Sequence, residues 1–265
     1  MDTAFTLSFG DGTDAVLAAS AAQACFDRID ALELLLTRFN DTSDVAVIRG
    51  LAPGKVTTVS QEMIRVLEIA VHVSAATGGA FDPTVERRNF FDLAIDVKHC
   101  RVMARGHVEL DLGGIGKGFA LDECRKILEN GQFGLDDWLL DAGTSTVLAS
   151  GGPWPLGVGG PFKDRTRLPK VVTLTSGALS GSGTEIQGAH IWDVRRGTTE
   201  TRWLQSWVVA PTGAVADALS TAALSLSPRE LQAAATALKA EIIVARRQPA
   251  WADRFRDPLR RFVAR

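Results

Sequence analysis

The stretch LDLGGIGKGFALD, residues 110–122, predicts a tight turn that leads into a helix. It places four glycines and Lys117 between Asp111 and Asp122. Glycine has no side chain, so the backbone can approach a ligand closely and adopt conformations closed to other residues. The run that follows, 117–130, has helical spacing, and the N-terminus of a helix presents backbone N–H groups to an anion. We therefore expect an anionic ligand to lie at this turn.

The two best-known nucleotide-binding glycine patterns do not fit this stretch. A P-loop needs serine or threonine after its Gly-Lys pair, whereas Lys117 is followed by Gly118. A dinucleotide-binding GxGxxG pattern that began at Gly114 would need glycine where the chain has Phe119. For the loop by itself, a strand-to-helix turn without a ligand remains the alternative.

A second stretch, ADALSTA at 216–222, carries three oxygen-bearing side chains with helical spacing. Asp217, Ser220 and Thr221 stand at i, i+3 and i+4, and on a helix they share one face. Hard divalent cations such as Mg2+ take oxygen ligands, often together with phosphates of the substrate. The neighbours are small or apolar, and a carboxylate in such surroundings needs a partner charge. Helix capping by the same side chains is the alternative.

Two further segments carry candidate site residues. In GAFDPTV, residues 79–85, an aromatic ring stands beside Asp82, a pairing that could hold the edge of a planar ring. The alternative is an ordinary Asp-Pro turn. In AHIWDVRRG, residues 189–197, His190 lies near charged side chains, and its ordinary pKa suits a proton acceptor near neutrality. A purely structural histidine is the alternative there.

Composition excludes several functional classes. The 265 residues are 46% hydrophobic, which is enough for one large domain or two small ones. The net charge of −2 gives no nucleic-acid footprint, and the arginine-rich end at 251–265 is expected to be a solvated surface segment. Three widely spaced cysteines argue against a disulfide framework and against a CxxC metal site. The four histidines show no HExxH spacing.

Targeting signals are weak. The first basic residue is Arg28, so the positive region of a secretory leader is missing, and no run of about 18 apolar residues could span a membrane. We expect a cytoplasmic chain as the sequence stands, or a periplasmic one if a leader has been removed.

Strands and helices are mixed without a regular βαβ rhythm, which favours an α+β fold with a mostly antiparallel sheet and packed helices. The expected helices are 14–39, 60–76, 117–130, 213–226 and 228–237. The expected strands are 3–9, 101–104, 107–112, 138–142, 145–150, 171–174, 178–180, 190–194, 207–210 and 241–245, with loop at 151–168.

The order of these motifs resembles the ApbE family, the FAD:protein FMN transferases. The resemblance is carried by FDPTV, then LDLGGIGKGFALD, then a His-Ile-x-Asp segment, then VVAPTGAVADALSTA, and the opening Met1-Asp2-Thr3 resembles that family's start. It runs over 1–226, nearly the whole chain. It implies a single T-fold-like domain over 1–265 that binds FAD and Mg2+. It further implies cleavage of FAD, attachment of FMN through a phosphoester to a Thr or Ser of a target flavoprotein, and release of AMP.

The resemblance also assigns roles to individual residues. The metal-facing set would be the carbonyl of Gly114 with Asp217, Ser220 and Thr221. The FAD-facing set would be Ala80, Phe81, Asp82, Asp111, Lys117 and Ile191. His190 would be the catalytic proton acceptor for the incoming hydroxyl. Two rival functions use the same site: an FAD pyrophosphatase that yields FMN and AMP, and a non-catalytic FAD-binding protein.

The chain departs from the family pattern on the acceptor side. Trp192, Val194 and Arg196 replace the second Ile, the Pro and the Thr of the family's His-Ile-Ile-Asp-Pro-Arg-Thr-Gly. The family's Ser-Gly-Asp-Tyr corresponds here to residues 182–185, and the chain has no tyrosine. We therefore expect the FAD and Mg2+ site to be retained and target recognition to differ.

Overall fold

One layer of the molecule is a seven-stranded sheet in which every pairing is antiparallel. The computed structural model describes residues 3–84, 89–143, 145–158, 170–183, 195, 197–198, 202–245 and 259–264. In sheet order, the strands are β1 (Thr6–Phe9), β5 (Trp138–Ala142), β6 (Thr146–Val158), β7 (Lys170–Gly183), β8 (Gln205–Ala210), β9 (Glu241–Ala245) and β10 (Leu259–Val263). This confirms the expected α+β class with a mostly antiparallel sheet.

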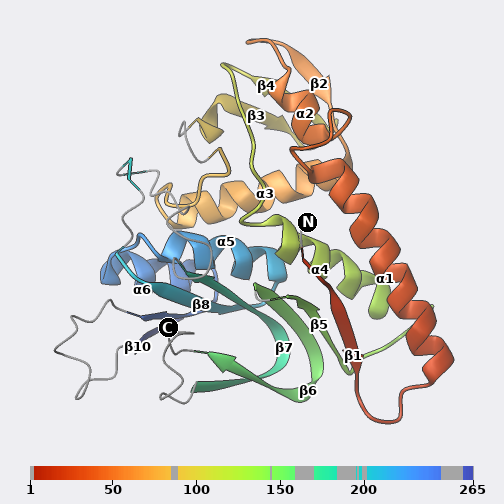
Figure 1. Ribbon diagram of the computed structural model, residues 1–265. Helices are drawn as coiled ribbons and strands as arrows, with labels where there is room; N and C mark the ends of the chain where they lie inside the picture. Colours follow the sequence, from red (N-terminus) through yellow and green to blue (C-terminus); the bar gives the residue numbers. More distant parts are fainter. Residues whose placement is uncertain are drawn as a thin grey trace.

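Helices cover one face of this sheet in layers (Figure 1). The main helices are α1 (Ala15–Leu36), α3 (Gln61–Ala76), α4 (Gly116–Leu128), α5 (Gly213–Ala223) and α6 (Pro228–Ala237). Helices α4, α5 and α6 lie directly on the sheet, α3 lies above them, and α1 runs along the side. No helix within the described ranges combines the length and apolar character that a membrane crossing requires.

A smaller sheet and a short helix sit beyond α3, at the far end of α1 (Figure 1). The strands are β2 (Val56–Thr58), β4 (Arg101–Ala104) and β3 (Leu93–Asp96), in that order across the sheet. The short helices are α2 (Asp44–Arg49) and the 3-10 turn η1 (Phe90–Asp92). Of these elements, β4 was predicted from the sequence, whereas α2, β2 and β3 were not.

The helices begin where their capping residues predict. Ser60 accepts a hydrogen bond from the N–H of Met63 at the start of α3. Ser227 and Glu230 form a reciprocal capping box at the start of α6. Each cap satisfies backbone N–H groups that the first helical turn leaves without partners. Local sequence therefore fixes these boundaries.

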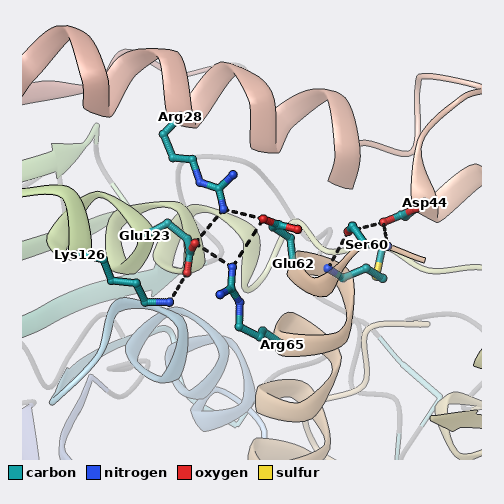
Figure 2. Close-up of polar contacts among 8 residues, drawn as sticks. Arg28, Asp44, Ser60, Glu62, Arg65, Glu123 and Lys126 are labelled. Atoms are coloured by element: carbon teal, nitrogen blue, oxygen red, sulfur yellow. Dashed lines mark hydrogen bonds and ion pairs between the residues drawn. The ribbon is translucent and has the colours of Figure 1, made fainter. Parts of the chain in front are cut away.

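A charge cluster joins three of the helices beside the glycine loop (Figure 2). Glu123 of α4 is 5% exposed and pairs with Arg28 of α1 at 2.8 Å, Arg65 of α3 at 2.9 Å and Lys126 of its own helix. Glu62 also pairs with Arg28, at 2.8 Å. Burial tends to raise the pKa of Glu123, but these cationic partners more than offset it and the pKa is lowered. The cluster fixes α4 against α1 and α3.

Residues 107–112 form no strand, although their alternating pattern predicts one. The alternate side chains are buried as expected. However, the N–H of Asp111 donates to the carbonyl oxygen of Pro83 at 2.6 Å, in a loop and not in a sheet. The pattern correctly indicated burial, but the segment pairs with no strand among the residues that the structure describes.

The prediction of a loop at 151–168 is wrong for residues 151–158, because β6 continues to Val158. Gly151 and Gly152 have φ of 70° and 96°, a conformation that usually marks a turn. Here they form an irregularity at which the register between β6 and β7 shifts. The strand therefore bends without ending.

The remaining differences concern strand lengths and ends. The strands expected at 171–174 and 178–180 are parts of the single strand β7. In the arginine-rich end, Leu259–Val263 pairs with β9 as β10 and is not merely a solvated tail. The strand expected at 190–194 lies outside the described residues.

Candidate functional site

The two halves of the candidate site meet where α4 crosses α5. A Cβ atom on Gly118 would overlap the carbonyl group of Gly213 and come within 2.7 Å of the nitrogen of Ala214. A Cβ atom on Gly213 would in turn overlap the carbonyl oxygen of Gly118. Two glycines are required because the two backbones touch directly at this crossing.

Each helix carries a carboxylate that caps the other. The oxygens of Asp122 on α4 accept hydrogen bonds from the N–H groups of Gly213, at 2.7 Å, and Ala214, at 2.9 Å. Oδ2 of Asp217 on α5 accepts a hydrogen bond from the N–H of Gly118 at 3.0 Å. Each carboxylate stands four residues after the crossing glycine of its own helix. The arrangement places a negative charge at each helix N-terminus, where the helix dipole stabilises it.

The two carboxylates differ in their environments. Burial raises the pKa of Asp122 to about 6, against the opposing effect of its two backbone hydrogen bonds. Asp217 is 3% exposed. The hydroxyl of Ser180 donates to Oδ1 of Asp217 at 3.5 Å. Within the described ranges no lysine, arginine or histidine forms an ion pair with Asp217. A buried carboxylate of this kind favours a cation as its partner.

The glycine loop closes over this carboxylate. A Cβ atom on Gly114 would stand 3.4 Å from Oγ1 of Thr221 and 3.5 Å from the ring of Phe81. Thr221 is half-buried and lies one helical turn beyond Asp217. The segments 79–85, 110–122 and 216–222 therefore converge on one place, as the sequence interpretation requires.

Ser220 is fully buried behind Asp217 and Thr221. Its hydroxyl donates to the backbone carbonyl oxygen of Asp217 at 2.9 Å. The hydroxyls of Ser180 and Ser182 lie 3.3 Å and 2.8 Å from its oxygen. The helical spacing of these side chains is thus as predicted, but the three do not have equal access to a ligand.

A hydroxyl bed, a set of buried and half-buried hydroxyl groups, lies on the sheet beneath α5, and it was not predicted from the sequence. Its members share one face of β6, β7 and β8: Thr146, Ser180, Ser182 and Ser206. Oγ1 of Thr146 lies 2.9 Å from Oγ of Ser180. The available signal was the alternation of serine with glycine along 180–183, which places two hydroxyls on one face of a strand.

The glycine loop is held by two of the six residues expected to face FAD, Asp111 and Lys117. Oδ1 of Asp111 accepts from the N–H of Gly113 at 2.9 Å, and its Oδ2 pairs with Arg38 at 3.0 Å. Nζ of Lys117 donates to the carbonyl oxygen of Gly113 at 3.1 Å. The expectation that α4 offers N–H groups to a ligand is modified, because Gly118 already donates to Asp217. The anion at this helix end is part of the protein.

The third segment supplies an apolar wall and a fixed turn. Ala80 and Phe81 are buried, and the N–H of Phe81 donates to Oγ1 of Thr77 at 3.2 Å. Oδ1 of Asp82 accepts from the N–H of Thr84 at 2.8 Å and from its hydroxyl. Asp82 thus makes the Asp-Pro turn that was the alternative reading. The same turn places Asp82 next to the apolar surface of Ala80 and Phe81.

His190 and Ile191 lie outside the described residues. The nearest described position after them is Arg195, which pairs with Glu230 of α6 at 2.7 Å and donates to the carbonyl oxygen of Ser225 at 3.2 Å. Partial burial tends to raise the pKa of Glu230, but hydrogen bonds from Ser227 and Arg195 outweigh this and lower the pKa to about 2. The chain is therefore anchored to α6 five residues after His190.

The donor set suits a hard cation. Within the described part of the chain, no three His, Cys, Asp or Glu side chains gather into a group that could hold a metal ion. The hydroxyl of Ser180 lies 3.5 Å from Oδ1 of Asp217, and Thr221 follows Asp217 by one helical turn. Mg2+ is typically bound through one or two carboxylates and completes its shell with water and with phosphate oxygens of a substrate.

Comparisons with known proteins support the resemblance that the order of the motifs indicates. The model of the ApbE family matches residues 1–90 and 86–244. The FAD:protein FMN transferase of Escherichia coli strain K12 is 24% identical over 83% of this chain and 74% of its own length.

Two solved structures share the fold. The flavin transferase ApbE from Vibrio cholerae superposes with a TM-score of 0.82 at 17% identity, covering 100% of this chain and 94% of that one. The ApbE protein from Thermotoga maritima gives a TM-score of 0.77 at 23% identity, with 92% and 91% covered. At these identities the likeness establishes the architecture.

Proposed function

The chain belongs to the ApbE family, and from this we propose that it is a Mg2+-dependent FAD:protein FMN transferase. In the proposed reaction the hydroxyl oxygen of a Thr or Ser on a target flavoprotein forms a bond to the FMN phosphorus of FAD. The bond from that phosphorus to the bridging oxygen breaks, AMP leaves, and the hydroxyl proton passes to a base. The E. coli relative carries the name of this activity.

The observation that carries the proposal is the buried Asp217 carboxylate, one helical turn before Thr221, which the glycine loop approaches at Gly114. A protein that only carried FAD would have no need of a buried carboxylate that lacks a cationic partner among the described residues. We propose that Asp217, the hydroxyl of Thr221 and the carbonyl of Gly114 hold Mg2+. The sequence-based assignment of Ser220 to the same set stays a prediction.

The chain's own groups would bind and orient FAD around this site. Mg2+, when bound, supplies neutralisation of charge on the diphosphate. Lys117 stands at the loop and would hold non-bridging phosphate oxygens. Ala80 and Phe81 offer the apolar wall for a planar ring, and Asp82 its polar edge.

The remaining assignments also stay proposals. Asp111 would reach FAD from the loop, with its charge balanced by Arg38. Ile191 would lie close to the ring. His190 would take the proton of the acceptor hydroxyl and must then come within hydrogen-bond reach of it. We further propose that 1–265 forms one domain, because a single hydrophobic cluster contains residues from α1 through β9.

The test is incubation of the protein with FAD, Mg2+ and a flavoprotein that presents a Thr or Ser acceptor. Mass spectrometry of the acceptor should show a covalent FMN adduct, and chromatography should show an equal amount of AMP. AMP without an adduct would identify an FAD pyrophosphatase. Bound FAD with neither product would identify a non-catalytic FAD-binding protein.

A further inference from the structure

Ser182 of β7 lies within hydrogen-bond distance of two hydroxyls on α5, those of Ser220 and Thr221. Its Oγ lies 2.8 Å from Oγ of Ser220 and 3.4 Å from Oγ1 of Thr221. Ser182 is half-buried, whereas Ser220 is fully buried.

The direction of these hydrogen bonds follows from counting protons. A hydroxyl has one proton to donate and two lone pairs that accept. Ser220 donates its proton to the backbone carbonyl oxygen of Asp217 at 2.9 Å. The 2.8 Å contact is therefore donated by Ser182, which leaves Ser182 as an acceptor toward Thr221.

The result is a one-way chain of hydroxyls. It runs from Thr221 to Ser182, on to Ser220, and ends on the carbonyl of Asp217. Hydroxyls linked in this way polarise one another. A threonine that ligates a cation must present a lone pair, so its proton must point elsewhere. Two acceptors lie 3.4 Å from the Thr221 hydroxyl, Oγ of Ser182 and the backbone carbonyl oxygen of Asp217. The carbonyl already accepts the proton of Ser220, so Ser182 is the acceptor that no other hydroxyl proton occupies.

We infer that Ser182 is a positioning residue that turns the proton of Thr221 away from the cation and so presents the Thr221 oxygen to it. The inference rests on the proposed function, since it supposes a divalent cation at Asp217 and Thr221. In this arrangement Ser220 accepts the hydrogen bond from Ser182 and so fixes the orientation of the Ser182 hydroxyl. Residues that orient metal ligands typically contribute about 10–100-fold to metal affinity.

The test measures Mn2+ affinity in the presence of FAD by electron paramagnetic resonance of the free ion. We expect Ser182→Ala and Thr221→Ala each to weaken Mn2+ binding about tenfold or more. The double variant should bind no more weakly than Thr221→Ala alone, because both changes remove one interaction. Ser182→Thr, which keeps the hydroxyl, should restore binding, and it serves as a second variant should Ser182→Ala not fold.

The matched control is Ser206→Ala. Ser206 lies on the same sheet face and donates to the backbone carbonyl of Ser220, outside the hydroxyl chain. Its loss should lower the melting temperature without changing Mn2+ affinity. Unchanged Mn2+ affinity in Ser182→Ala, or losses that multiply in the double variant, would overturn the inference. A wild-type protein that binds no Mn2+ with FAD would instead overturn the proposed function, and this inference with it.

Discussion

The backbone N–H of Gly118 donates a hydrogen bond to the carboxylate of Asp217 at 3.0 Å, across a separation of 99 residues. The contact joins the glycine loop to the helix that carries the candidate cation ligands. The reciprocal contacts from Gly213 and Ala214 to Asp122 complete the junction. The position of Asp217 is therefore set by α4 as much as by its own helix.

Replacing Asp217 with asparagine should separate charge from structure. The amide oxygen of Asp217→Asn can still accept from Gly118, so the fold should persist and some FAD should remain bound. AMP release should fall by about 100-fold or more, because a bound metal contributes several kcal/mol of charge stabilisation. Chromatographic measurement of AMP at fixed Mg2+ checks this. Full activity in the variant would remove the metal assignment.

The α4–α5 crossing should not tolerate a side chain. Gly118→Ala should lower the free energy of unfolding by about 3 kcal/mol, because its Cβ meets backbone atoms that cannot rotate away. Gly131→Ala is the matched control, since a Cβ there meets nothing within 4 Å, and it should change stability by less than about 0.5 kcal/mol. Urea denaturation of both variants decides the matter. Equal stability in the two would contradict the close approach.

Asp122 should give stability a dependence on pH. Its pKa rises from 3.8 to about 6 on folding, so the folded state holds the proton more tightly than the unfolded chain. Its contribution to stability is then fully present below about pH 4 and is lost as the pH rises through 6, on the order of 3 kcal/mol. Denaturation curves between pH 4 and 7 should show this fall in the wild type and a flatter profile in Asp122→Asn. Parallel profiles would refute it.

Glu123 should matter for the packing of α1, α3 and α4. Glu123→Gln leaves Arg28 and Arg65 without their buried anion and should cost about 3 kcal/mol of unfolding free energy. Glu129→Gln, at the exposed C-cap residue of the same helix, should cost less than about 1 kcal/mol. Thermal denaturation of the pair measures the difference. A variant at Glu123 no less stable than the one at Glu129 would show that the cluster is not stabilising.

His190 remains the predicted proton acceptor for the incoming hydroxyl. His190→Ala should slow formation of the covalent FMN adduct more than it slows release of AMP to water, because only transfer to protein requires deprotonation of a serine or threonine. Parallel time courses of adduct by mass spectrometry and AMP by chromatography test the difference. Two unaltered rates would rule the role out.

The parts of the fold that local sequence specifies could be predicted. Ser60 and Ser227 start helices because their hydroxyls satisfy nearby N–H groups, and this needs only adjacent residues. The boundaries of β5 likewise follow from alternation between buried and half-buried side chains. The loop prediction from Gly151 onward was wrong because glycines with positive φ occur both in turns and at bends within a strand. Only the neighbouring strand decides between the two.

The site shows the same division. Helical spacing predicted that Asp217 and Thr221 share a face, and the motif order predicted that Gly114 would join them. The different burial of Ser220 and the donation from Gly118 depend on contacts between distant elements. No periodicity within one segment carries that information. The serine–glycine alternation at 180–183 could indicate two hydroxyls on one strand face, but their position under α5 is visible only in the folded chain.

The glycine–aspartate crossing also constrains how such a protein can be recombined. The two helices fit each other through main-chain atoms, so neither half of the site can be exchanged alone. A chimera that takes 110–128 from a relative should inherit a mismatched partner unless 211–223 is transplanted with it. The coding regions of the two helices should therefore be inherited together.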